Sequence, residues 1–197
     1  AQLDSLADVE ISAIKTGMLG TADLVDVVAA FLEAHSTVPV VVDPVRVSSS
    51  GHRLLDVEGE LRMRTKLLPL ADVLTPNIPE AEVLLGASIQ TLSQAEEAAR
   101  ALARLGASSV VLKGGHLSTD PIVDLLWDGE ALHRFTCPRE SRGTAHGTGC
   151  VQSATLAALL ALGRSLPDSV AQTQRQLARG IAAARYIGGG CLVEPLA

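Results

Sequence analysis

The stretch Val38-Pro39-Val40-Val41-Val42-Asp43-Pro44 decides the fold class of this 197-residue chain. Its β-branched residues follow one another without polar alternation, which is typical of a strand buried on both faces of a parallel sheet. Pro44 cannot continue a central strand, because proline has no backbone N–H to donate to a neighbouring strand. The pattern therefore predicts a buried strand that ends at the Asp43 carboxylate.

Strands and helices alternate on both sides of this stretch. Short apolar runs predict strands at 9–14, 38–42, 71–74, 109–112, 123–127 and 131–135, the last two joined at the hairpin signal Asp128-Gly129. Helical spacing of apolar residues predicts helices at 23–34, 57–68, 80–85, 93–105, 151–162 and 167–186, with a loose tail from Gly188. This alternation predicts an α/β fold of three αβα layers around a mostly parallel sheet, in one domain spanning 1–197.

The composition is that of a globular chain and argues against several classes of protein. Hydrophobic residues make up 47% and charged residues 19%, which excludes a disordered chain. Aromatic residues make up 2% and the formal net charge is −6, so no nucleic-acid partner is expected. The three cysteines form no disulfide or metal pattern, and the apolar stretch 156–162 is too short to cross a bilayer. We therefore expect a cytoplasmic protein without a membrane partner.

Polar residues and glycines that follow the predicted strands are the first candidates for a functional site. Asp43, Asn77 and Lys113 each follow a strand, and the turn Gly147-Thr148-Gly149 leads into a long helix. Ligands of parallel α/β sheets bind beyond the carboxyl ends of the strands. We therefore expect these residues to converge on one crevice.

The stretch His146-Gly147-Thr148-Gly149-Cys150 is the sharpest single motif. Glycines on both sides of Thr148 leave backbone amides open beside a helix N-terminus, which favours a bound anion. The same stretch also fits a tight turn in which Thr148 caps the helix. Cys150, in the first helical turn, fits either an activated thiol or a small buried hydrophobe.

The other strand ends allow two interpretations each. Asn77-Ile78-Pro79-Glu80 has the spacing of a capping box, and its amide and carboxylate also suit a water-mediated Mg²⁺ site that positions ATP phosphates. Asp43 suits a functional carboxylate at a strand end or the start of a turn. Lys113-Gly114-Gly115 suits a nucleotide phosphate or a strand-end turn.

Five motifs in order resemble one family of enzymes. They are Lys15-Thr16-Gly17-Met18-Leu19, Val41-Val42-Asp43-Pro44-Val45, Leu74-Thr75-Pro76-Asn77-Ile78-Pro79-Glu80-Ala81-Glu82, Val111-Leu112-Lys113-Gly114-Gly115-His116 and His146-Gly147-Thr148-Gly149-Cys150. Over roughly residues 1–185, the chain resembles hydroxymethylpyrimidine/phosphomethylpyrimidine kinase, a thiamine-biosynthesis family with the ribokinase-like fold. The resemblance implies transfer of the γ-phosphoryl group of ATP to 4-amino-5-hydroxymethyl-2-methylpyrimidine, and a second transfer to the monophosphate.

The resemblance also implies roles at the acceptor side of such a site. Gly147, Thr148 and Gly149 would form the anion hole for the transferred group. Cys150 stands where most ribokinase-like enzymes carry a catalytic aspartate, and would either line the hydroxymethyl site or accept its proton. Val45 would contact the pyrimidine ring.

At the nucleotide side, the resemblance implies ATP and Mg²⁺ as ligands and a small pyrimidine as the other substrate. The residues implied at the nucleotide are Lys113, Asn77, Gly115 and His146, and those implied at the metal are Asp43 and Glu80. Relatives of this kind are usually dimers, so the resemblance implies a homodimer.

The sequence departs from the family at its start, at Arg46, and at Ala145 with the tail after Gly190, and two other functions stay open. The family starts before residue 1 with a glycine-rich segment, so the chain is expected to be incomplete at its N-terminus. Arg46 stands where the family carries an apolar residue, and a cation beside the pocket is expected to alter substrate choice. The alternatives are a pyridoxal or pyridoxine kinase and a non-catalytic nucleotide-binding fragment that needs a partner chain.

Overall fold

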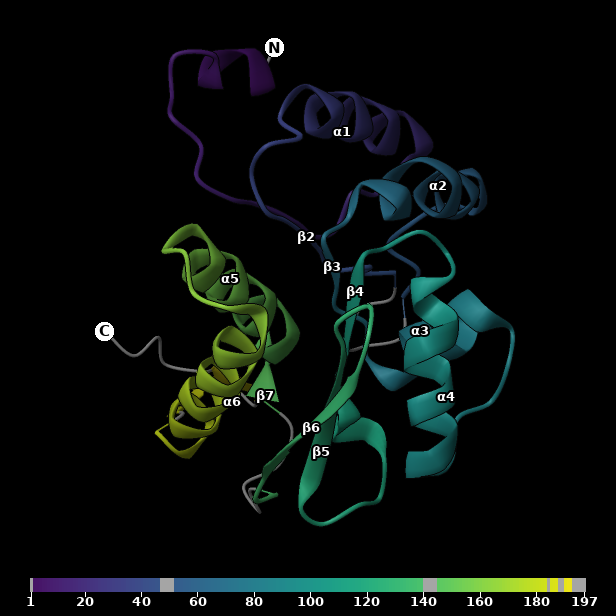
Figure 1. The fold of residues 1–197 in the computed structure, drawn as a ribbon, viewed down its shortest axis with the longest axis vertical. Helices are drawn as coiled ribbons and strands as arrows, with labels where there is room; N and C mark the ends of the chain where they lie inside the picture. Colours follow the sequence, from purple (N-terminus) through teal and green to yellow (C-terminus); the bar gives the residue numbers. More distant parts are fainter. Residues whose placement is uncertain (1, 47–51, 140–144, 184, 188–189, 193–197) are drawn as a thin grey trace.

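Six strands form the central sheet of the computed structural model, which describes residues 2–46, 52–139, 145–183, 185–187 and 190–192 (Figure 1). They are β1 (Ile14–Thr16), β2 (Val40–Val42), β3 (Val73–Leu74), β4 (Ser109–Leu112), β5 (Ile122–Trp127) and β6 (Leu132–Cys137). The strands lie side by side in this order; β1 to β4 are parallel, and β5 is antiparallel to both β4 and β6. The prediction of a mostly parallel sheet is confirmed.

Helices cover both faces of the sheet (Figure 1). On one face lie α1 (Ala22–Ala34), α3 (Ile78–Leu85) and α4 (Leu92–Ala103), with α2 (Val57–Arg62) packed against α1; on the other lie α5 (Thr148–Ala161) and α6 (Leu166–Ala182). Alternation along the strands divides the core, because Val40 and Val42 pack toward the first group and Val41 toward the second. The predicted three αβα layers are therefore confirmed.

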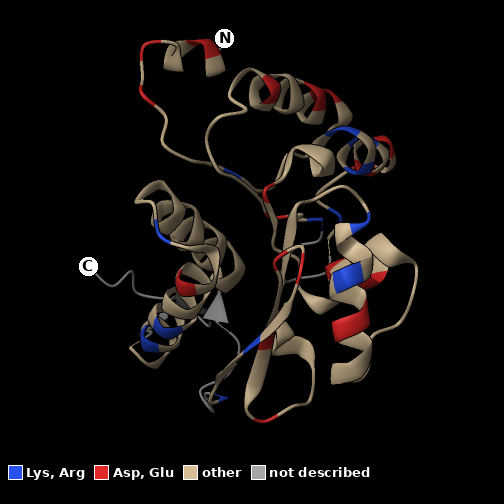
Figure 2. Ribbon diagram, viewed as in Figure 1, with Lys and Arg blue, Asp and Glu red and all other residues tan. Residues whose placement is uncertain are grey.

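Charged residues keep mainly to the helices and loops, while most of the central strands are uncharged (Figure 2). On the outer side of the first layer, Asp26 of α1 pairs with Lys66 at 2.8 Å and also with Arg62 of α2. Within the described ranges, no helix is both long enough and apolar enough to cross a membrane.

The boundaries of three elements differ from the predictions. Strand β1 begins at Ile14 rather than near residue 9, because its partner β2 is only three residues long. The helix predicted at 57–68 is α2 followed by a π-helical turn (Met63–Leu67) and a 3₁₀ turn (Leu68–Leu70), and Pro69 in the latter lacks the N–H that an α-helix needs.

The third difference lies near the C-terminus. The last helix ends at Ala182 instead of residue 186. In the tail expected to be loose from Gly188, residues 190–192 form a strand, and the other residues of the tail lie outside the described part of the structure. Strand β8 (Arg185–Ile187) pairs antiparallel with β9 (Gly190–Leu192), which pairs parallel with β7 (Ala145–His146). A second, small sheet therefore lies next to the start of α5.

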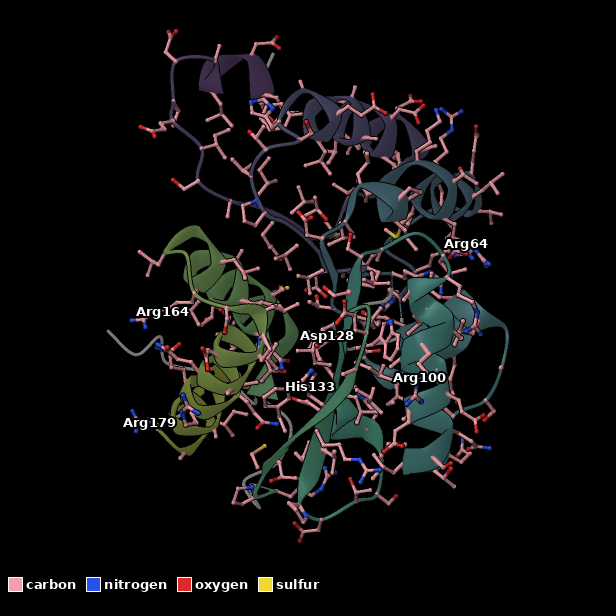
Figure 3. The ribbon with its side chains drawn as sticks, viewed as in Figure 1. Arg64, Arg100, Asp128, His133, Arg164 and Arg179 are labelled. Carbon is pink, nitrogen blue, oxygen red and sulfur yellow. The ribbon has the colours of Figure 1, made fainter. Side chains whose placement is uncertain are left out.

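Strands β5 and β6 form the hairpin predicted around Asp128-Gly129. The Asp128 carboxylate accepts hydrogen bonds from the N–H groups of Ala131 at 2.7 Å and Glu130 at 2.9 Å, and lies 2.6 Å from His133 Nε2 (Figure 3). The two backbone donors, followed by His133, lower the pKa of Asp128 from 3.8 to about 2. On the neighbouring strand end, Arg100 of α4 stacks over the Trp127 ring.

Asp128→Ala is expected to lower the urea midpoint of unfolding at neutral pH, because it removes the acceptor of this turn. The folded pKa lies below the ordinary value, so the contribution of Asp128 is full above the unfolded pKa of 3.8 and is lost as the pH falls toward about 2. Urea titrations from about pH 6 down to about pH 3 should show that the difference in unfolding midpoint between Asp128→Ala and wild type becomes smaller. Glu130→Ala, an exposed neighbour, is the control, and a gap that stays constant with pH would contradict the prediction.

Candidate active site

Side chains from four neighbouring strands meet at the carboxyl edge of the sheet. Asp43, directly after β2, lies with its Oδ1 3.0 Å from Nζ of Lys113, which follows β4. Its Oδ2 lies 3.9 Å from Nζ of Lys15 on β1, and Thr75 after β3 donates its hydroxyl to Oδ1 at 3.5 Å. The structure thus brings Asp43 and Lys113 into direct contact at the predicted place.

The Asp43 carboxylate is deeply buried, and helix α5 also reaches it. Ser153 donates its hydroxyl to Oδ2 at 2.9 Å, and only 1% of Asp43 is exposed. Lys113 is also buried, so the two charges attract each other in surroundings of low dielectric constant. The ion pair therefore fixes the Lys113 ammonium where β4 ends.

Asn77 and Glu80 form a complete capping box at the start of α3. Asn77 Oδ1 accepts the Glu80 N–H and Glu80 Oε2 accepts the Asn77 N–H, both at 2.8 Å. The backbone of Asn77 also bridges to Lys113, so the box stands beside the ion pair. Burial raises the pKa of Glu80 above its ordinary value; Lys113 opposes this shift and Asp43 adds to it.

The turn before α5 brings glycine backbone to the Lys113 ammonium. Gly147 is the N-cap residue, and its φ of +81° is a left-handed conformation that favours glycine. Thr148 is the first helical residue, so the interpretation of Thr148 as the cap is wrong, and Gly147 has no side chain to satisfy the helix N-terminus. A Cβ on Gly149 would lie 3.2 Å from Lys113 Nζ, so this turn faces the cation.

A cleft of about 240 Å³ opens beside these residues. Of the predicted site residues, Asn77, Lys113, Gly115, Thr148 and Gly149 line it. Its apolar lining includes residues of β5 and α6, namely Ile122, Leu177, Ala178 and Ile181. A cation and helix-terminal amides next to an apolar wall suit a ligand that is anionic at one end and flat and apolar at the other.

The remaining predicted residues lie elsewhere. Asp43, Glu80, Val45, Gly147 and Cys150 are not among the residues that line this cleft. Val45 is half-buried, and its N–H donates to the Asp43 carbonyl oxygen at 2.8 Å. Cys150 is exposed, so its interpretation as a buried hydrophobe is wrong. The side chain of His146 lies outside the described part of the structure.

Three buried polar residues in the cleft wall were not found by motif analysis. Asp124 on β5 accepts the Gly114 N–H at 2.8 Å, and the side-chain amides of Gln152 on α5 and Gln174 on α6 at 3.2 Å each. Burial raises the pKa of Asp124, and these donors act against the shift. The available signal was a carboxylate inside the apolar strand 122–127, since a buried charge requires partners.

Arg46, which the sequence led us to expect as a cation beside the pocket, is paired within the chain. Its side chain is buried and pairs with Glu60 of α2, which also pairs with Arg53 at 2.9 Å. Burial alone would raise the pKa of Glu60, but the hydrogen bonds and charges of the two arginines lower it. The charge of Arg46 is therefore balanced within the chain.

Comparisons of the sequence with known proteins identify its family. The family profile of phosphomethylpyrimidine kinase matches residues 1–194. The chain is 43% identical over 190 residues to a bifunctional thiamine biosynthesis protein of Geobacter sulfurreducens, covering 96% of this chain and 39% of that protein. It is 38% identical over 192 residues to the hydroxymethylpyrimidine/phosphomethylpyrimidine kinase of Staphylococcus aureus, covering 96% of this chain and 70% of the relative.

Solved structures with the same fold contain bound nucleotide analogues. The pyridoxal kinase of Staphylococcus aureus in complex with AMP-PCP and pyridoxal superposes with a TM-score of 0.89 at 31% identity, covering 98% of this chain and 70% of that one. The chain therefore spans well under half of the bifunctional relative and about 70% of the two kinases. With a family profile that matches almost the whole sequence, the chain belongs to the phosphomethylpyrimidine kinase family.

Proposed function

We propose that this chain catalyses the ATP-dependent phosphorylation of 4-amino-5-hydroxymethyl-2-methylpyrimidine and of its monophosphate. The observation that carries the proposal is the Lys113 ammonium, which is held 3.0 Å from Asp43 and faces Gly149 in the wall of the cleft. Phosphoryl transfer is accelerated mainly by positioning and by stabilisation of charge on the transferred group. A fixed cation opposite the open amides of a helix N-terminus supplies both.

The donor side of the reaction is assigned to the cleft and to the turn that precedes α5. In this proposal Lys113 and the backbone of Gly147, Thr148 and Gly149 hold the ATP phosphates, with Gly115 and His146 beside them. The apolar wall receives the base. In support, the pyridoxal kinase of Staphylococcus aureus was solved in complex with AMP-PCP, an ATP analogue.

The carboxylates fit Mg²⁺ that is held together with a nucleotide. Mg²⁺ commonly takes one or two protein carboxylates, keeps several waters and binds phosphate oxygens. Among the residues that the structure describes, no group of three His, Cys, Asp or Glu side chains could hold a metal alone. We therefore propose that Asp43 and Glu80, with Asn77 acting through water, hold Mg²⁺ beside the phosphates, where it neutralises charge.

The acceptor side falls to Val45 and Cys150. In the transfer, the hydroxymethyl oxygen bonds to the γ-phosphorus, the bond from that phosphorus to the bridging oxygen of ADP breaks, and the hydroxyl proton leaves. A loose transition state needs little proton abstraction at an early stage. Cys150 therefore either contacts the hydroxymethyl group or accepts the proton late, and Val45 contacts the pyrimidine ring.

The family profile and the sequence relatives support the pyrimidine over pyridoxal. The profile is that of phosphomethylpyrimidine kinase, and the two sequence relatives described above, 38% and 43% identical, are named for pyrimidine phosphorylation or thiamine biosynthesis. The homodimer implied by the resemblance stays a prediction, which sedimentation equilibrium tests.

Release of ADP from Mg-ATP by the 197-residue chain tests the function directly. The acceptors are hydroxymethylpyrimidine, its monophosphate and pyridoxal, each compared with a reaction that lacks an acceptor. We expect ADP release with both pyrimidines. Release with pyridoxal alone would assign the chain to the pyridoxal kinases, and silence with all three would favour the non-catalytic fragment.

Cys150→Ala is expected to lower kcat by about tenfold or more, because the thiol that contacts the acceptor is lost. The KM for ATP should stay within about twofold of wild type, since Cys150 does not line the nucleotide cleft. Steady-state kinetics with each substrate varied in turn measure both values. Equal losses in kcat and in ATP affinity would instead indicate that Cys150 only shapes the start of α5.

A further inference from the structure

Asp124 has a place in the cleft that the proposed reaction does not use. The residue is 5% exposed, and its carboxylate has partners on three different elements around the cleft. Gly114 belongs to the turn after β4, Gln152 to α5 and Gln174 to α6. Gln174 is fixed in turn, because its amide also donates to the Phe135 carbonyl oxygen on β6 at 3.0 Å.

Two of these contacts, those of Gly114 and Gln152, lead to groups that face each other, namely Lys113 and the N-terminal turn of α5. Gly114 directly follows Lys113, and its N–H donates to Asp124 at 2.8 Å. The N–H of Lys113 itself donates to the Pro76 carbonyl oxygen, which follows β3, at 2.8 Å. The backbone that carries the cation is therefore held from β3 and from β5.

Gln152 ties the same carboxylate to the helix whose N-terminal amides face Lys113. Asp43 makes a parallel connection, because it binds the Lys113 ammonium and the hydroxyl of Ser153, the residue after Gln152. Two buried carboxylates thus link the end of β4 to the second turn of α5, Asp43 through side chains and Asp124 through the Gly114 backbone.

We propose that Asp124 is a positioning residue that sets the spacing between Lys113 and the N-terminus of α5, acting through Gly114 and Gln152. The inference rests on the proposed function in one respect, namely that ATP phosphates bind between these two groups. Displacement of a reacting group by about 1 Å can lower a rate by about a hundredfold. A carboxylate that holds both groups in place therefore affects turnover without touching the substrate.

Two variants of Asp124 remove this connection to different extents. Asp124→Leu keeps the approximate shape and removes every acceptor. Asp124→Asn keeps an acceptor for Gly114, but replaces charge-assisted hydrogen bonds with weaker neutral ones and turns an amide group toward the glutamines. Asp72→Asn is the matched control, because Asp72 also accepts a backbone N–H, that of Val40 at 2.8 Å, but at the opposite end of the sheet.

The first measurement is hydrogen exchange of the peptide containing residues 113–117 in the nucleotide-free protein. We expect markedly faster exchange in Asp124→Leu, about twofold faster exchange in Asp124→Asn, and no change in Asp72→Asn. If Asp124→Leu does not fold, Asp124→Asn carries the test. Exchange at the wild-type rate in Asp124→Asn would then overturn the proposal. This measurement is independent of any enzymatic activity.

The second measurement is steady-state kinetics with hydroxymethylpyrimidine. We expect kcat/KM for ATP to fall about ten- to hundredfold in Asp124→Leu, and less in Asp124→Asn, with the KM for the pyrimidine nearly unchanged. A wild-type kcat/KM for ATP, or an equal change in the pyrimidine KM, would overturn the positioning role. An inactive wild type would refute the proposed function instead, and the exchange rates would still decide whether Asp124 holds Gly114.

Discussion

Gly114→Ala is expected to destabilise the folded chain by about 3 kcal/mol or more. A Cβ at this position would overlap the carbonyl oxygen of Val123 and lie 2.8 Å from its carbonyl carbon. Both atoms belong to the backbone of β5, which is paired on one side with β4 and on the other with β6. No side-chain rotation relieves the overlap, so the strand or the turn must move, and the hydrogen bond to Asp124 is strained as well.

Gly115→Ala is the matched control for this substitution. A Cβ at Gly115 would meet no atom within 4 Å, although the residue is the next one in the same turn. Urea and thermal unfolding of both variants measure the difference. We expect Gly115→Ala to unfold close to wild type, and a Gly114→Ala protein as stable as Gly115→Ala would contradict the close approach of the turn to β5.

Lys113→Ala is expected to lower kcat by about 10²- to 10³-fold, the size of effect seen when a positioned group that stabilises transition-state charge is removed. The substitution removes the cation that faces the Gly149 turn and leaves Asp43 buried without its nearest positive charge. Steady-state kinetics measure the loss, and urea unfolding shows how much of the protein remains folded at the assay temperature.

Lys66→Ala controls for the loss of a lysine–aspartate pair as such. Lys66 lies 2.8 Å from Asp26, a similar distance to that between Lys113 and Asp43, but this pair is on the outer side of α1 and α2. We expect wild-type turnover from Lys66→Ala. A Lys113→Ala protein that keeps more than about a tenth of wild-type kcat would show that Lys113 is no phosphate ligand.

Many of the residues of the site could be predicted, because simple rules place them at the carboxyl edge of the sheet. Residues that follow buried parallel strands all reach one edge, so the sequence alone predicts that Asp43 and Lys113 converge. The capping box of Asn77 and Glu80 was equally accessible, because it depends only on residues three positions apart. The hairpin at Asp128 follows from a two-residue turn signal.

Partners that are distant in sequence could not be predicted in the same way. Asp124 binds Gln152 and Gln174, which are 28 and 50 residues away, and no periodicity connects them. The pairing of Arg46 with Glu60 could not be predicted either, because nothing in the sequence shows that Glu60 takes up its charge. The exposure of Cys150 depends on the residue at which α5 begins, and one or two positions of error at a helix boundary change which side chains are buried.

The contacts of Asp43 also have a consequence for how the protein folds. They join residues 70 positions apart, to Lys113, and 110 positions apart, to Ser153. These contacts form only when the ends of β2 and β4 have met α5, and contacts of large sequence separation slow folding. No local unit of the described chain contains both Lys113 and the turn before α5. The recovery of catalysis after dilution from denaturant thus reports completion of the whole fold, rather than the formation of any one of its helices or hairpins.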